Sequence, residues 1–279
     1  MENGKPSRTA WRVAVRRAVH QVLDRPPVLD DPIALPLLGR DFAFDPSQET
    51  HPVARAFRAF MAARSRWAED RLAAAIAAAT TQYVVLGAGL DTFAWRNPFP
   101  SLRVFEVDFP ATQEWKKSML AAAGLAKPAN LTFAPVDFEQ EALGEGLARG
   151  GFDSRTRAFF GWLGVVPYLT LGAFRSTLAT IAALPAGTQV VFDYALSPEN
   201  FSPLRRMFFA ALATRVARAG EPFKLFFAPE QLEEELRRAG FRGVERIGAD
   251  GLNDLYFRGR SDGLELPSPG MGMMAAATV

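Results

Sequence analysis

The chain has 279 residues, 49% of them hydrophobic, so it can bury one large core or two small ones. Its 32 Lys and Arg residues nearly balance 30 Asp and Glu and form no run, which argues against a nucleic-acid-binding arm. The absence of cysteine excludes disulfides, thiolate catalysis and zinc–sulfur sites, and no apolar stretch reaches the roughly 18 residues of a membrane span.

The first third of the chain predicts helices. Apolar residues recur at helical spacing over residues 9–23, and a short second helix is expected to close near Gly39. Residues 52–79 predict a long, Ala-rich helix. We therefore expect residues 1–79 to form a helical cover over the remainder of the domain.

Strand and helix patterns then alternate along the chain. Strand patterns occur at 82–86, 102–107, 131–135, 157–163, 188–194, 242–247 and 254–258. Helix patterns occur at 110–123, 139–149, 171–183 and 229–239. Such alternation predicts an α/β fold with a mostly parallel, seven-stranded sheet and helices on both faces. We expect a single domain over residues 1–260 and a mobile tail, rich in Gly, Pro, Ser and Ala, over residues 261–279.

A long connection interrupts this alternation at residues 195–228 and contains six Phe. One interpretation is a helix that completes the core. The other is a helical lid over the carboxyl ends of the strands, where open α/β sheets bind ligands, and its length and aromatic content favour this one. As a lid it would contact the substrate through Phe201, Phe208 and Phe209, and Arg205 would be a candidate partner for an acidic group.

The most informative segment is residues 83–108, YVVLGAGLDTFAWRNPFPSLRVFEVD. A buried strand leads into the turn Gly87-Ala88-Gly89, and a second strand ends in Glu106 and Asp108. Glycines allow a sharp turn and close approach of a ligand, and an acid about 20 residues later can accept hydrogen bonds from both hydroxyls of a ribose. The pattern indicates an adenosine cofactor, although an ordinary strand–helix turn with solvated acids is the structural alternative.

Two residues distinguish between adenosine cofactors. The dinucleotide fingerprint requires a third glycine where this chain has Thr92, and Asp91 before it would repel a pyrophosphate. A carboxylate at that place suits a ligand with an ammonium and a sulfonium. The turn therefore favours S-adenosylmethionine over a nicotinamide cofactor.

The same block resembles a known family. LGAGLDTFAWR followed by FEVDFP is similar to the leucine carboxyl methyltransferase family, and residues 7–39, 63–72 and 162–170 resemble further motifs of its bacterial small-molecule branch. The resemblance implies a Rossmann-like class I methyltransferase fold, an enzyme, and S-adenosylmethionine as the cofactor. It also implies cofactor contacts for ten residues: Arg17, Arg64, Gly87, Ala88, Gly89, Asp91, Glu106, Asp108, Asp137 and Phe138.

In that assignment the methionine moiety lies on the glycine turn, with its ammonium near Asp91. Asp137 and Phe138 follow the third strand, at the family's position for adenine. The cofactor carboxylate falls to Arg64, because a guanidinium can clamp a carboxylate with two parallel bonds, and Arg17 could assist. Arg66, two residues from Arg64, should lie on another face of the helix.

The fourth-strand motif WLGVVPYLT departs from the leucine carboxyl enzymes. Their glutamate is replaced by Leu163, whereas the following tyrosine is retained as Tyr168. Tyr168 and Tyr194 could orient the methyl acceptor. The two histidines, His20 and His51, lie far from the cofactor motif, so no general base is evident, which favours an acceptor that is already ionised.

These features predict a cytoplasmic O-methyltransferase of natural product biosynthesis. Its partner would be an apolar, aromatic or polyketide-like small molecule with a carboxylate or acidic hydroxyl, and we expect no metal, nucleic acid or membrane. The alternatives are a protein C-terminal carboxyl methyltransferase and a non-catalytic or non-methylating relative that binds the same cofactor. The oligomeric state stays open.

Overall fold

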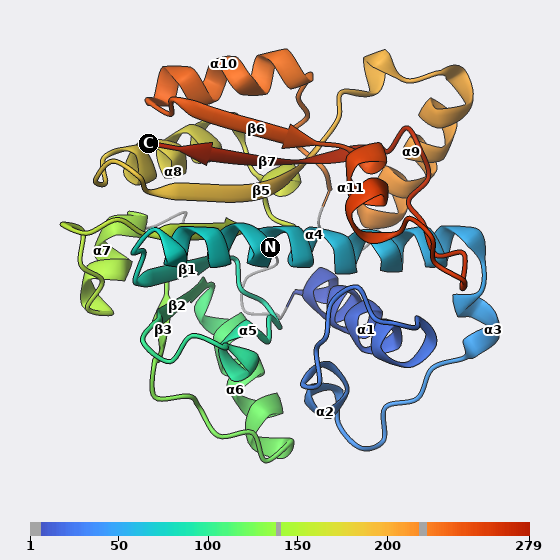
Figure 1. Cartoon of the computed structure of the whole chain (residues 1–279), viewed down its shortest axis with the longest axis horizontal. Coiled ribbons are helices and arrows are strands. Elements are labelled where there is room, and N and C mark those ends of the chain that lie inside the picture. The colour runs from blue at the N-terminus through green and yellow to red at the C-terminus, as the bar shows by residue number, and fades with distance from the viewer. Residues whose placement is uncertain (1–6, 138–140, 218–221) are drawn as a thin grey trace.

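The computed structural model describes residues 7–137, 141–217 and 222–279. They form a seven-stranded sheet in the order β3-β2-β1-β4-β5-β7-β6 (Figure 1). The strands are β1 (Gln82–Leu86), β2 (Arg103–Asp108), β3 (Leu131–Pro135), β4 (Phe159–Trp162), β5 (Gln189–Ala195), β6 (Gly243–Ile247) and β7 (Gly272–Thr278). β1 to β5 are parallel, and β7 runs antiparallel to both of its neighbours. The expected mostly parallel α/β sheet is confirmed.

Helices cover both faces of the sheet. They are α1 (Arg8–Leu23), α2 (Ala34–Leu38), α3 (Pro46–Glu49), α4 (Pro52–Ala77), α5 (Phe93–Arg96), α6 (Pro110–Ala122), α7 (Leu143–Arg149), α8 (Leu171–Ala182), α9 (Pro203–Ala217), α10 (Pro229–Ala239) and α11 (Ala249–Tyr256). Two short 3₁₀ helices, η1 (Val166–Tyr168) and η2 (Pro198–Asn200), follow β4 and β5. In Figure 1, α4 crosses the middle of the molecule, with α1 to α3 on one side of it and β5 to β7 on the other.

The two faces of the sheet have separate cores because successive strand residues point in opposite directions. Val85 and Val104 pack with α4, α5 and α11 on one face. Val84 and Phe105 pack with α7, α8 and α10 on the other. A third cluster joins α1 and α2 to α6 and to Leu90, directly after the glycine turn. The N-terminal helices α1 and α2 therefore pack against the segment that follows this turn.

The C-terminal segment differs from the prediction. Residues 272–278 do not form a mobile tail but the strand β7, which pairs with β5 on one side and β6 on the other. Its short apolar side chains suit a place covered on both faces, and Met274, Ala275 and Ala277 are buried. The boundary expected at residue 260 is thus wrong, and the predicted strand 254–258 is the end of α11 and the turn after it.

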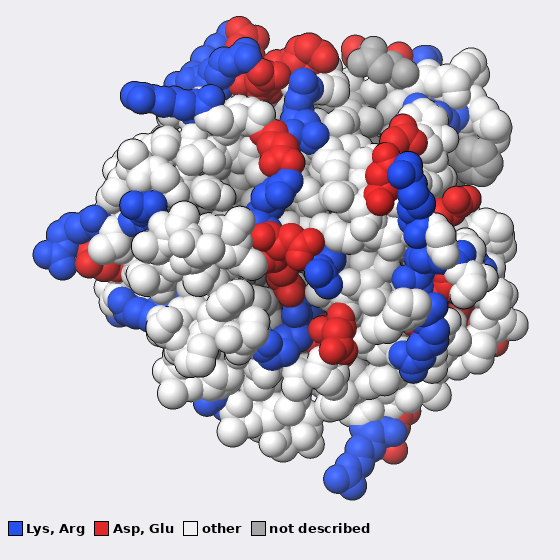
Figure 2. Space-filling view, viewed as in Figure 1, with Lys and Arg blue, Asp and Glu red and all other residues white. Residues whose placement is uncertain are grey.

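Charged side chains are distributed in pairs over the surface. On the face seen in Figure 2, uncharged residues cover most of the area, and many of the basic side chains lie next to acidic ones. Pairs such as Arg175 with Glu235, 2.7 Å apart, connect neighbouring elements. Within the three described ranges, no helix combines the length and the apolarity needed to cross a membrane.

Candidate functional site

The glycine turn after β1 and the tip of β2 meet at the carboxyl edge of the parallel strands. Gly87 and Gly89 adopt left-handed backbone angles, with φ of +64° and +49°. The Gly89 amide donates to Asp108 Oδ2 at 2.5 Å, and the Phe109 amide donates to Asp108 Oδ1 at 2.7 Å. Asp108 thereby joins the turn to the end of β2.

Protein side chains, rather than open space, lie beside both glycines. A Cβ on Gly87 would lie 2.4 Å from Val165 Cγ2, and one on Gly89 would lie 3.0 Å from the Ala10 Cβ. Val165 belongs to the loop after β4, and Ala10 to the first turn of α1. The absence of side chains at the two glycines therefore lets these two segments pack closely against the turn. The sequence did not predict this packing. Ala88 between them is buried and its amide donates to the carbonyl of Val107.

The two acids of β2 have different environments. Glu106 is 1% exposed, and Lys116 of α6 lies 2.5 Å from its Oε2. Burial raises the pKa of Glu106 to about 7, although the charge of Lys116 acts in the opposite direction. Glu106 is thus buried and paired with Lys116, and its contact with a ribose stays a prediction.

Asp91 and Arg17 form an ion pair across the turn. Arg17 Nη1 lies 3.3 Å from Asp91 Oδ2, and the Phe93 amide donates to Asp91 Oδ1 at 2.8 Å. Arg17 Nη2 donates to Asp31 and to Thr92, each at 2.5 Å. Burial alone would raise the pKa of Asp91, but the charge of Arg17 and those of two other cations outweigh it and lower that pKa. Arg17 thus fastens α1 to the turn, which does not support its expected contact with the cofactor.

Arg64 lies on α4 against the ends of β4 and β5. Its Nη1 lies 3.1 Å from Asp193 Oδ2, and a Cβ on Gly164 would come within 3.0 Å of both Nη atoms. Its buried Nε has no hydrogen-bond partner among the described residues. Arg66 is half-exposed and pairs with Asp70 on α4 itself, so the prediction that the two arginines lie on different faces is confirmed. Arg64 is therefore a buried cation whose Nε is left without a partner in the described part of the chain.

Asp193 is a residue that the sequence analysis missed. Its Oδ1 accepts from the Gly164 amide at 2.5 Å while Oδ2 faces Arg64. Tyr194 was the expected contact, but neighbouring residues of a strand point to opposite faces, and Tyr194 points into the core. It is 2% exposed, its hydroxyl donates to Met273 Sδ at 3.4 Å, and burial raises its pKa to about 12. The sequence Phe192-Asp193-Tyr194 near the end of a parallel strand could have indicated Asp193. It does not show which of these side chains faces the site and which faces the core.

The chain is similar in sequence to a known protein family and to several of its relatives. Residues 10–182 match the model of a family described as leucine carboxyl methyltransferase. YktD of Bacillus subtilis (strain 168), provisionally described as an S-adenosyl-L-methionine-dependent methyltransferase, is 32% identical over 95% of each chain. This chain belongs to the leucine carboxyl methyltransferase family. A similarly described protein of Saccharopolyspora erythraea is 34% identical over 66% of each chain.

Solved structures share the fold of this family member. A provisionally described methyltransferase of Thermobifida fusca YX has a TM-score of 0.57 at 18% identity, covering 99% of this chain and 96% of its own. A duf574 family protein of Streptomyces avermitilis has a TM-score of 0.55 at 17% identity, covering 95% and 96%. The expected class I fold, enzyme class and cofactor are confirmed: the chain is an S-adenosylmethionine-dependent methyltransferase.

The residues of this methyltransferase fit such a cofactor at two points. The Nε of Arg64, without a partner among the described residues, is a buried donor suited to a carboxylate, and Asp108 places its carboxylate at the tip of β2, beside the glycine turn. Asp137, half-buried after β3, stands at the predicted adenine position. Phe138, its expected companion, lies outside the described residues.

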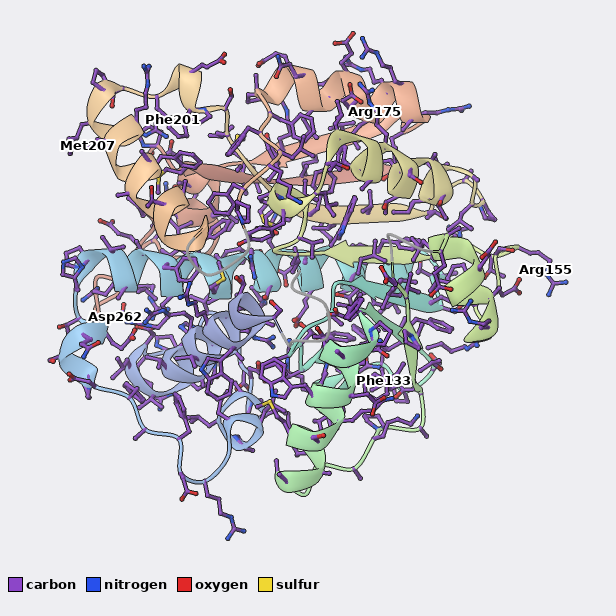
Figure 3. All side chains as sticks on the ribbon, turned by 180° about the vertical axis from the view of Figure 1, so that it is seen from behind. Phe133, Arg155, Arg175, Phe201, Met207 and Asp262 are labelled. Carbon is purple, nitrogen blue, oxygen red and sulfur yellow. The ribbon has the colours of Figure 1, made fainter. Side chains whose placement is uncertain are left out.

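Aromatic side chains gather between η1 and α9. The Tyr168 ring lies 5.3 Å from that of Phe223, and the Phe209 ring lies 5.6 Å from Phe201 and from Phe226. We call Tyr168, Phe201, Phe209, Phe223 and Phe226 the aromatic cluster. Figure 3 shows Phe201 on the inner side of α9 and Met207 on its outer side, where Met207 is 60% exposed.

Arg205 and Phe208 are the other two residues of α9 that were expected to contact the substrate. Arg205 Nη2 donates to the carbonyl of Gly270 at 2.5 Å, and its guanidinium lies 4.5 Å from the centre of the Phe201 ring. The buried Nε of Arg205 has no partner among the described residues. Phe208 is on α9, but its side chain is outside the described part of the chain. Arg205 therefore joins α9 to the segment that leads into β7.

Neither histidine is placed to act as a base. His20 is 1% exposed, its Nδ1 lies 2.7 Å from Asp24, and its Nε2 accepts from the Val28 amide. His51 is exposed and caps α4 by accepting from the Val53 amide. Both histidines therefore have structural roles.

Proposed function

We propose that this enzyme methylates an oxygen of an apolar small molecule, aromatic or polyketide-like, of the kind made in natural product biosynthesis. The observation that carries the proposal is the aromatic cluster beside the loop after β4. That loop contacts both Arg64, through Gly164, and the glycine turn, through Val165. An aromatic surface that adjoins the cofactor residues in this way suits a flat, apolar acceptor.

The cofactor would be held by residues from four elements. We assign its carboxylate to Arg64, its ribose to Asp108 and its adenine to the segment beginning at Asp137. Gly87 and Gly89 would present backbone to the methionine moiety. Asp91 would contribute negative potential near the ammonium, moderated by Arg17, which shares its carboxylate.

The protein's contribution to the reaction is positioning. The bound sulfonium supplies the methyl group and the leaving group. Tyr168 and the phenylalanines of the aromatic cluster would hold the acceptor oxygen in line with them, and such positioning can contribute roughly 7–11 kcal/mol. A carboxylate with an ordinary pKa of about 4 needs no base at neutral pH, which agrees with the structural roles of His20 and His51. The unpaired Nε of Arg205, next to Phe201, is the candidate partner for an acidic acceptor.

The test is a methyl-transfer assay over three acceptor sets, with formation of S-adenosylhomocysteine as the readout. The sets are aromatic carboxylic acids and phenols, their neutral analogues, and peptides ending in a leucine carboxylate. Turnover on the first set supports the proposal. Turnover on the peptides alone would identify a protein carboxyl methyltransferase, and cofactor binding without transfer to any acceptor would identify a non-catalytic relative.

A further inference from the structure

We propose that Asp193 is a positioning residue that couples the cofactor site to the acceptor side. This inference rests on the assignment of the cofactor carboxylate to Arg64. Asp193 lies near the carboxyl end of β5, is 6% exposed, and divides its two oxygens between two partners on different elements. Oδ2 faces Arg64 Nη1 of α4 at 3.1 Å, and Oδ1 accepts from the Gly164 amide of the loop after β4 at 2.5 Å.

The first partner is oriented by this contact. With Nη1 engaged by Asp193, the edge of the Arg64 guanidinium formed by Nε and Nη2 is left for a ligand, and Nε is buried without a partner in the described structure. An unconstrained arginine loses rotamer freedom when it binds. Asp193 and the close approach of Gly164 hold Arg64 in place before the ligand arrives, which reduces that loss.

The second partner extends the effect to the acceptor side. Gly164 is followed by Val165, which packs on Gly87, and then by η1, whose Tyr168 contacts Phe223 of the aromatic cluster. One carboxylate therefore connects the cation of the cofactor site to the loop that borders the acceptor. A carboxylate bound at Arg64 strengthens the Arg64–Asp193 arrangement and, through Gly164, stabilises this loop. By linkage, an ordered loop favours cofactor binding to the same extent.

The experiment compares two ligands on the full-length protein by isothermal titration. S-adenosylhomocysteine carries the carboxylate, and its decarboxylated analogue keeps the adenosine, thioether and ammonium. Asp193→Asn replaces one of two acceptor oxygens by a donor, so one of the two contacts is lost. The Kd of S-adenosylhomocysteine should rise about tenfold or more, the equivalent of about 1.4 kcal/mol, while that of the analogue stays within about twofold. Asp193→Glu should restore part of the affinity.

Asp70→Asn is the matched control, because Asp70 pairs with Arg66 on another face of α4. It should change neither Kd. Equal rises for the two ligands in Asp193→Asn, or no rise in either, would overturn the role of Asp193. Arg64→Ala distinguishes a failure of the role of Asp193 from a failure of the cofactor assignment to Arg64. A selective loss for S-adenosylhomocysteine in Arg64→Ala without one in Asp193→Asn refutes only this inference, whereas no selective loss in Arg64→Ala refutes the cofactor assignment itself.

A measurement on the unaltered protein tests the coupling without any variant. Amide hydrogen exchange over residues 163–170 should slow more with saturating S-adenosylhomocysteine than with the saturating decarboxylated analogue. Equal protection by both ligands would show that the carboxylate does not act on the loop, and the coupling would be refuted.

Discussion

The close contact between Gly87 and Val165 can be tested without any ligand. Gly87→Ala would place a Cβ 2.4 Å from Val165 Cγ2, on a residue with φ of +64°. The left-handed backbone costs a residue with a Cβ about 1–2 kcal/mol, and overpacking costs about 1–3 kcal/mol more. The free energy of unfolding, measured by urea denaturation without cofactor, should therefore fall by about 2–5 kcal/mol.

The Gly87→Ala/Val165→Ala double variant separates the two costs. Removing the Val165 methyls relieves the clash and leaves the backbone strain, so the double variant should be about 1–3 kcal/mol more stable than the sum of the single losses predicts. Additivity within about 0.5 kcal/mol would refute the clash. If Gly87 served the ligand alone, Gly87→Ala would weaken S-adenosylhomocysteine binding and leave the unliganded stability nearly unchanged.

Three further outcomes are expected. Arg64→Ala should weaken S-adenosylhomocysteine binding by about 1.5–3 kcal/mol in titration calorimetry, and Arg66→Ala much less; equal effects would contradict the assigned helix face. The pKa of Glu106 in the folded protein, about 7, lies above its ordinary value of 4.5. The contribution of Glu106 to the free energy of unfolding is therefore full below pH 4.5 and is lost as the pH rises through 7. Relative to Glu106→Gln, the wild-type protein should thus lose roughly 3 kcal/mol of unfolding free energy between pH 4.5 and 8, and a flat difference would disprove the raised pKa. Phe209→Ala should raise acceptor KM and spare cofactor affinity, whereas a parallel loss of both, with about 3–5 kcal/mol of stability, would make α9 part of the core.

Local pattern was enough to predict most of the sheet. β1 to β5 have continuous or alternating apolar residues, and the glycine turn follows β1 without a gap, so neighbouring residues carry the information. β7 escaped prediction because alanine and methionine have weak strand preference of their own. Its structure depends on β5 and β6, which are distant in sequence, and no local signal represents those partners.

The sequence indicated the types of residue at the site better than their burial and their ion-pair partners. The sequence placed Glu106 and Asp108 at the end of β2, but only the packing of α6 decides that Lys116 buries the first and leaves the second at the strand tip. Likewise, Arg17 was expected to assist at the cofactor carboxylate. Its partners are instead Asp31, in the connection before α2, and Asp91 and Thr92, directly after the glycine turn. Burial and pairing of charges depend on contacts between distant segments, which spacing along the chain does not record.

The place of β7 also constrains the order in which the chain can fold during synthesis. β6 is joined to the sheet only through β7, although β6 is translated first. Until residues 272–278 have left the ribosome, β5 has an unpaired edge and β6 has no strand to join. Such an edge is a template for pairing with other chains, so the nascent chain is open to such pairing in that interval.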